Sequence, residues 1–201
     1  MKLFYSSRSP FVRKVLITAY EAGLAGEIEL LDSHAHSVDR DRTIIAHNPL
    51  GQVPTMVLDD GTMLADSGVI CAYLDGVGSG GMFPTEEKKL WKALVDQAMG
   101  DGLMTASLIA RYEVATRPKE FFWQAWLDAH LDKIGTTLDA FEKEAAEYGG
   151  RFDIGLAAIV SALSYLDLRF EDLGWRNRCP SLAAWYAAVQ DRPSIRATPL
   201  I

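Results

Sequence analysis

The fold is decided near the N-terminus by the stretch KLFYSSRSPFVRKVLITAYEAG, residues 2–23. Its opening run, Lys2–Tyr5, is short, apolar and aromatic, which predicts a β-strand. Apolar residues then recur at helical intervals of three and four, at Val12, Val15, Leu16 and Ala19. Pro10 suits the first turn of that helix and Gly23 suits its end. A strand followed directly by a helix therefore opens the chain.

Strand and helix signals continue to alternate as far as residue 75. The expected elements are a strand at Glu27–Leu31, a polar stretch with one short helix at Ser33–Asn48, a β-hairpin made by Thr55–Leu58 and Thr62–Leu64, and a helix at Asp66–Leu74. The turn signal of the hairpin is Asp59-Asp60-Gly61. The order β-α-β-α-β-β-α predicts a small mixed sheet, with its first two strands parallel and its last two antiparallel.

Helical periodicity dominates after the glycine-rich stretch Gly76–Gly81, which predicts a linker. The expected helices are a long one from Glu86 to about Ala115, a second along Trp123–Phe141, a third centred on Ile154–Leu163, and a short one at Leu182–Val189. The third is apolar nearly all round, so we expect it at the buried centre of a helical domain. These patterns divide the chain into a domain over 1–76, a linker over 77–85 and a helical domain over 86–201.

Composition limits the classes of function. A net charge of −7 argues against a general affinity for nucleic acid, which depends on clustered Lys and Arg. The two cysteines, Cys71 and Cys179, lie far apart and form neither a CxxC motif nor a zinc motif. His34 and His36 lack further ligands nearby, so we expect no metal. The longest apolar stretch is about half of the ~20 residues that cross a bilayer, and the first residues are not typical of a signal peptide. We therefore expect a cytoplasmic protein without a membrane partner.

Three short motifs in register carry a family resemblance. They are SPFVRKV at 9–15, directly after a strand, NPLGQVP at 48–54, directly before a strand, and LADS at 64–67, at the start of a helix. In this order, followed by a helical half, the chain resembles the glutathione transferase superfamily, most of all bacterial members with an SPFVRK start. The resemblance implies an α/β thioredoxin-like N-terminal domain, an all-α C-terminal helical bundle and a homodimer.

Ser9 has two interpretations. The pattern alone favours a helix N-cap before Pro10. The resemblance implies that Ser9 is the catalytic residue, whose hydroxyl donates a hydrogen bond to the glutathione thiolate. A charge-assisted hydrogen bond contributes about 1.5–3 kcal/mol, which lowers a thiol pKa by about one to two units. Ser7 and Tyr5 are the alternative candidates for this role.

The other two motifs supply the implied glutathione contacts. By resemblance the Val53–Pro54 bond is cis, and the Val53 N–H and C=O pair with the cysteinyl backbone of glutathione. A trans proline at a strand edge is the alternative. Asp66 is expected to face the ammonium group of the γ-glutamyl moiety, and Ser67 its carboxylate, at a helix start that attracts anions. An Asp66 that caps the helix is compatible with this role.

Two more residues complete the implied set. Gln52 is expected to reach the glycyl end of glutathione, and Phe11 belongs to the glutathione-binding residues. With Ser9 where other families have cysteine, thiol–disulfide exchange is disfavoured. Glutathione-dependent isomerases usually carry a Ser-Ser-Cys run where this chain has Arg8-Ser9-Pro10.

The function that the resemblance implies is that of a glutathione S-transferase. Glutathione is the co-substrate, and its thiolate attacks a small hydrophobic electrophile held by the helical domain. The alternative is a non-catalytic protein of the same fold that binds glutathione or acts as a scaffold.

Two expectations concern the helical half alone. Asp153 is expected to cap the central helix, although Leu156 stands where the family commonly has an acid. A set of aromatic residues is expected mostly in the core, with part of it lining the electrophile site: Tyr112, Phe121, Phe122, Trp123 and Trp126.

Overall fold

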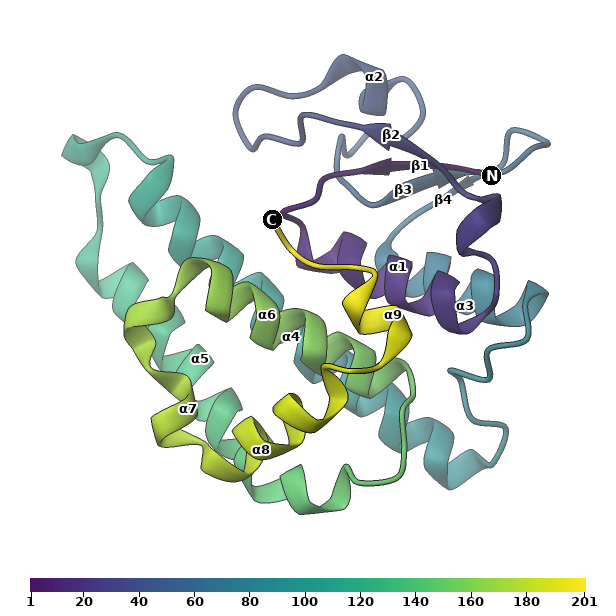
Figure 1. The fold of residues 1–201 in the computed structure, drawn as a ribbon. Helices are drawn as coiled ribbons and strands as arrows, with labels where there is room; N and C mark the ends of the chain where they lie inside the picture. The colour runs from purple at the N-terminus through teal and green to yellow at the C-terminus, as the bar shows by residue number, and fades with distance from the viewer.

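Four short strands form one mixed sheet in the computed structural model, which describes residues 1–201 (Figure 1). The strands are β1 (Lys2–Tyr5), β2 (Glu29–Asp32), β3 (Thr55–Val57) and β4 (Met63–Leu64), in the order β2-β1-β3-β4. β1 is parallel to β2 and β3 is antiparallel to β4, as the element order predicts, and β3 also pairs with β1 in antiparallel fashion. β2 begins two residues later than expected, because Ala25–Glu27 form a 3-10 turn before it.

Two helices lie between the sheet and the helical half (Figure 1). They are α1 (Pro10–Glu21) and α3 (Ser67–Val77). The N-terminal half has one more α-helix, the single turn α2 (Arg42–Ile45). α1 and α3 pack on each other and enclose a core that includes Leu3, Val15 and Ile70. α3 continues through Gly76, where the expected linker would have begun, because an exposed glycine weakens a helix without ending it.

The remaining helices form a bundle around one central helix. They are α4 (Glu87–Ala115), α5 (Gln124–Glu144), α6 (Ile154–Arg169), α7 (Trp175–Arg178), α8 (Pro180–Val189) and α9 (Pro193–Arg196). Every residue of α6 from Ile154 to Leu166 is buried, as expected. α4 crosses it closely, because a Cβ on Gly155 would lie 2.5 Å from the Asp96 Cβ and one on Gly100 would lie 2.8 Å from the Ala158 Cβ. The two glycines therefore set the distance between α4 and α6.

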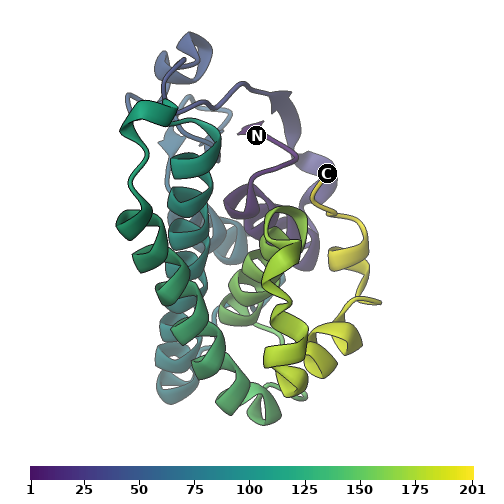
Figure 2. The ribbon, with the colours of Figure 1, turned by 90° about the vertical axis from the view of Figure 1, so that its left-hand side faces the viewer.

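Buried polar contacts join the two halves across α1. The ammonium of Lys14 is fully buried and lies 2.6 and 2.8 Å from the two carboxylate oxygens of Asp101 in α4. The guanidinium of Arg13 donates to the Ser164 hydroxyl in α6 and to the carbonyl of Ile195 in α9. Figure 2 shows the C-terminal segment returning to the N-terminal half, so α1 is held from several elements of the bundle.

The aromatic residues around the α4–α5 connection are not in the core. Phe121 and Trp123 are 66% and 62% exposed, and Phe122 and Trp126 are exposed as well. This connection lies at one end of the molecule (Figure 1), beyond the part of α6 that would cover it, so the expectation of a mainly buried set was wrong. No helix in the structure is both long enough and apolar enough to cross a membrane.

Candidate active site

The sheet register brings the three sequence motifs to one edge. Phe4 of β1 pairs with Thr55 of β3, so Val53 and Pro54 continue alongside the residues that follow β1. Met56 of β3 pairs with Leu64 of β4, so the chain after β4 reaches the same edge. α1 and α3 both begin there, and their N-terminal ends carry partial positive charge. The loop before each helix and the loop before β3 therefore form one candidate site.

Ser9 caps α1 and keeps its hydroxyl proton free. Its Oγ accepts the N–H of Val12 at 3.3 Å, and its own backbone is in the β conformation, as an N-cap requires. The hydroxyl donates to no atom of the protein. Because a hydroxyl has one proton and two lone pairs, capping uses a lone pair and leaves the proton for another acceptor. The two interpretations of Ser9 are therefore compatible.

The alternative hydroxyls are placed less well for the same role. Ser7 faces the end of the chain, because its Oγ lies 3.5 Å from the carbonyl of Ile201 and its own carbonyl accepts the Ile201 N–H. Tyr5 is half-buried at the end of β1, where it pairs with Asp32 and packs against the core. Neither residue lies at a helix start.

The loop before β3 presents an unpaired piece of backbone. The Val53–Pro54 bond is cis, as the resemblance implied. The N–H and C=O of Val53 form no hydrogen bond within the protein, although the neighbouring loop is fixed. Thr55 Oγ1 donates to the Gln52 carbonyl at 2.7 Å and accepts from Asn48 at 2.8 Å. A rigid loop with a free donor and acceptor can pair with an added strand.

Asp66 and Ser67 begin α3. Asp66 is the N-cap, because its Oδ1 accepts the Gly68 N–H at 2.9 Å. It is exposed, whereas Ser67 is buried. The buried Gln97 of α4 also reaches this helix start, where its Nε2 lies 3.2 Å from the Cβ position of Gly68. Gln97 was missed by the sequence analysis, since a single polar residue within a long helix gives no local signal.

Two predicted site residues remain, Gln52 and Phe11. Gln52 is exposed, and its side chain makes no hydrogen bond with the protein. Phe11, in the first turn of α1, is half-buried and packs against the core.

Neither cysteine of the chain is a reactive thiol. Cys71 lies in α3, fully buried, where it accepts a hydrogen bond from Thr18 at 3.3 Å. Burial raises the pKa of the Cys71 thiol to about 11. Burial also raises the pKa of Cys179. Burial and a raised pKa both disfavour these two thiols as nucleophiles at neutral pH.

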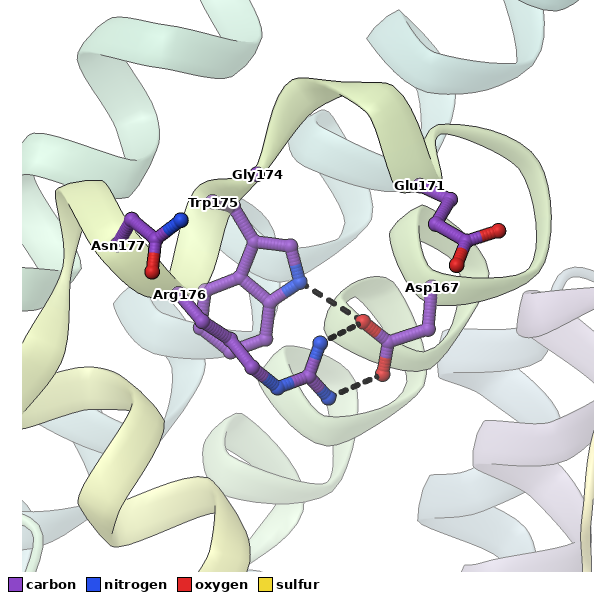
Figure 3. Close-up of a pocket in the computed structure, with 6 residues that line it drawn as sticks. All are labelled: Asp167, Glu171, Gly174, Trp175, Arg176 and Asn177. Carbon is purple, nitrogen blue, oxygen red and sulfur yellow. Dashed lines mark hydrogen bonds and ion pairs between the residues drawn. The ribbon is translucent and has the colours of Figure 1, made fainter.

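A recess between α6 and α7 is not part of the site (Figure 3). It is lined by Asp167, Glu171, Gly174, Trp175, Arg176 and Asn177. Its main polar groups satisfy one another, because both oxygens of Asp167 accept from Arg176, at 2.5 and 2.7 Å, and Trp175 donates to Asp167 at 2.8 Å. No polar group of this triad is left for a ligand.

Comparisons with known proteins identify relatives of both halves of the chain. Two family models match, described as the N-terminal domain of glutathione S-transferase over residues 8–77 and its C-terminal domain over residues 124–188. A solved glutathione transferase family member from Pseudomonas fluorescens Pf-5, with bound glutathione, is 41% identical with a TM-score of 0.95 and covers 100% of this chain and 98% of that one. A structure of such a family member with bound S-(propanoic acid)-glutathione is 40% identical with a TM-score of 0.91 and covers 100% of both chains.

A curated relative matches over nearly the whole length as well. The uncharacterized GST-like protein YibF of Escherichia coli K12 is 30% identical over 202 residues, which is 98% of each chain. Matches to both domain models, and relatives similar over their full length, identify this protein as a member of the glutathione S-transferase family.

Proposed function

We propose that this protein is a glutathione S-transferase in which Ser9 activates the thiol of glutathione for attack on a small hydrophobic electrophile. The observation that carries the proposal is the Ser9 hydroxyl, which accepts the Val12 N–H and keeps its own proton for an anion at the mouth of α1. A donated hydrogen bond stabilises the thiolate but not the thiol, so it lowers the thiol pKa.

The residues around Ser9 support an ordered placement of glutathione. Its cysteinyl backbone would pair with Val53, whose N–H and C=O have no partner within the protein. Its γ-glutamyl group would lie at the start of α3, with its ammonium facing Asp66 and its carboxylate facing Ser67 and the positive helix end. Gln52 and Phe11 would contact the rest of the tripeptide. This placement directs the sulfur toward Ser9.

The chemistry follows from a thiolate held in place. The sulfur forms a bond to an electrophilic carbon, and the leaving group departs with its electron pair, or a proton adds to the neighbouring carbon where a double bond is attacked. The relatives from Pseudomonas fluorescens bind glutathione and a glutathione with propanoic acid on its sulfur. A site that accepts a substituent on sulfur is consistent with thioether formation, and no step here requires a metal.

The proposal includes a homodimer in the cytoplasm, with the helical domain, residues 86–201, holding the electrophile. The face offered to a second copy is the exposed apolar surface of α3 and α4, formed by Val69, Val77, Trp91, Val95 and Met99. Apolar side chains on adjacent helices of one face are typical of an obligate interface.

Binding and turnover separate this function from its alternative. The wild-type protein should be retained on immobilised glutathione and should conjugate 1-chloro-2,4-dinitrobenzene. Ser9→Ala should still be retained but lose about 10- to 100-fold in rate, the value of one to two pKa units. Ser7→Ala, a neighbouring hydroxyl directed at Ile201, is the matched control and should keep its activity. Retention of the wild type without turnover on a panel of electrophiles would favour a non-catalytic glutathione-binding protein. A wild-type protein that is not retained would refute the proposed function and leave only the scaffold alternative.

A further inference from the structure

Three arginines beside the candidate site have no carboxylate partner in the protein. Arg8 directly precedes Ser9, Arg111 lies in α4, and Arg169 is the last residue of α6. None of the three side chains forms an ion pair, and the hydrogen-bond partner of Arg169 is the hydroxyl of Tyr165. Five other arginines of this acidic chain each pair with a carboxylate: Arg117, Arg151, Arg176, Arg178 and Arg192. The other seven of the twelve arginines form no ion pair, so the three beside the site stand out by their position and not by being unpaired.

We call these three arginines the arginine cluster, because Arg8 and Arg111 lie near enough to Arg169 for their charges to act on it. Burial lowers the pKa of Arg169, and the neighbouring charges of Arg111 and Arg8 lower it further. Tyr165, one helical turn before Arg169, is buried, and the charges of Arg111 and Arg169 act on its hydroxyl. The Nε of Arg169 is buried without any hydrogen-bond partner. Three other buried polar atoms also lack a partner, at Arg13, His130 and Tyr148, but the Arg169 Nε is the one within the arginine cluster, where an acceptor on a ligand would satisfy it.

The cluster also lies on the side of Ser9 that faces the bundle. α6 packs on α1, where Arg13 reaches Ser164, one residue before Tyr165. α4 packs on α6 along most of its length. The Val53 and Asp66 loops approach Ser9 from the sheet instead. The cluster therefore belongs to the part of the site beyond the sulfur, where the electrophile would bind.

We propose that the electrophile carries a carboxylate next to its hydrophobic body, and that Arg111 and Arg169 bind this carboxylate while Arg8 adds positive charge beside Ser9. The inference rests on the proposed function and names its substrate class. A planar guanidinium matches a carboxylate with two parallel hydrogen bonds. An anion also relieves the repulsion among the three cations, none of which is paired with a carboxylate of the protein.

Two derivatives of glutathione that differ only in charge test this inference. S-carboxymethylglutathione carries a carboxylate on the sulfur substituent, and S-carbamoylmethylglutathione carries a neutral amide of nearly the same size. Their dissociation constants are measured by calorimetry, together with that of glutathione itself. We expect the carboxymethyl derivative to bind at least ~10-fold more tightly, which is about 1.4 kcal/mol. Binding is read without turnover, so a slow enzyme does not obscure the result.

Variants locate the source of the preference. Arg111→Gln and Arg169→Gln should each lose most of it, with the affinity for the neutral derivative unchanged. Arg196→Gln is the matched control, since Arg196 is an exposed arginine of α9 without an ion pair, and it should keep the preference. Arg169 is partly buried, so a melting curve must show that its variant is folded. If it is not, the half-buried Arg111 decides the test.

The other outcomes overturn the inference in distinguishable ways. Equal affinity of the wild type for both derivatives would refute the inference that the electrophile carries a carboxylate. It would leave the proposed function intact. An equal loss for both derivatives and for glutathione in the arginine variants would show that the cluster binds a carboxylate of glutathione instead. A wild-type protein that binds none of the three compounds would refute the proposed function, and the inference with it.

Discussion

The two sides of the candidate site are built from different kinds of groups. On the sheet side, Ser9, Val53 and Asp66 offer helix ends and unpaired backbone, each shaped by the few residues around it. On the bundle side, the arginine cluster offers long side chains from three separate segments. The first arrangement depends on local turns and on the sheet register. The second depends on how α4 and α6 pack against α1, so it can change with the bundle while the first is retained.

The largest expected effect concerns the contact that joins the two sides. Asp101→Asn would leave the Lys14 ammonium, 0% exposed, without its counter-charge. Breaking a buried ion pair from one side costs about 3–5 kcal/mol. Because the Asp101 side chain is 29% exposed, we expect the free energy of unfolding to fall by about 3 kcal/mol, the lower end of that range. Urea unfolding of the variant and the wild type measures the difference.

The double variant Lys14→Met with Asp101→Leu is the control for that loss. It removes both charges and should recover most of the stability, since a buried ion pair contributes little compared with apolar packing. A single variant as stable as the wild type would show that the Lys14–Asp101 pair does not hold the halves together. A folded single variant could also keep its glutathione affinity and lose its preference for the carboxylate derivative. That result would show that the Lys14–Asp101 pair positions the bundle side of the site and not the sheet side.

The second prediction concerns the sheet side alone. Ser9→Ala removes the donor to the thiolate and should raise the pKa of the thiol of bound glutathione by about one to two units. The sign follows from the charged form that the hydrogen bond stabilises. Activity should fall at neutral pH and approach that of the wild type above the new pKa. The ultraviolet absorbance of the thiolate, titrated in both proteins, measures the shift. Unchanged titration curves would remove Ser9 from the mechanism.

A smaller loss is expected at the cap of the central helix. Asp153 Oδ1 accepts the N–H groups of Gly155 and Leu156 at 3.0 and 3.1 Å, and its Oδ2 pairs with Arg151 at 2.8 Å. A capping side chain contributes about 0.5–2 kcal/mol to stability. Because Asp153 also forms an ion pair, we expect Asp153→Ala to lower the free energy of unfolding by about 2 kcal/mol, the upper end of that range. Asp153→Asn should cost less, because asparagine caps equally well. Thermal unfolding measures both, and equal melting temperatures for the alanine variant and the wild type would exclude the capping role.

The sequence predicted the sheet side far better than the bundle side. The Asp66 and Asp153 caps follow from residues next to them in the chain, the cis Val53–Pro54 bond was implied by the family resemblance, and the fold follows from periodicity and element order. The arginine cluster joins residues that are more than fifty positions apart, and Gln97 reaches α3 only through tertiary packing. The aromatic residues near Trp123 look like core residues by type, but their burial depends on which neighbour covers them.

The smallest expected effect concerns the two protein thiols. It tests whether a thiol of the protein, and not that of glutathione, is the reactive sulfur. Burial raises the pKa of Cys71 to about 11, above its ordinary value of 9.0, so this thiol stays protonated at neutral pH. The sign of the linkage is that Cys71 contributes stability below pH 9, which is lost as the pH rises toward 11, because the unfolded thiol ionises first.

Treatment of the folded protein with iodoacetamide at neutral pH, followed by removal of the reagent, should therefore leave both cysteines unlabelled and conjugation unchanged. Mass spectrometry of the treated protein counts the labels, and the same treatment in denaturant, where both thiols ionise normally, is the control. Rapid labelling of Cys71 in the folded state would place a reactive thiol of the protein in the helix that Asp66 caps. The sulfur chemistry would then no longer require glutathione, and the division of the site into a glutathione side and an electrophile side would lose its basis.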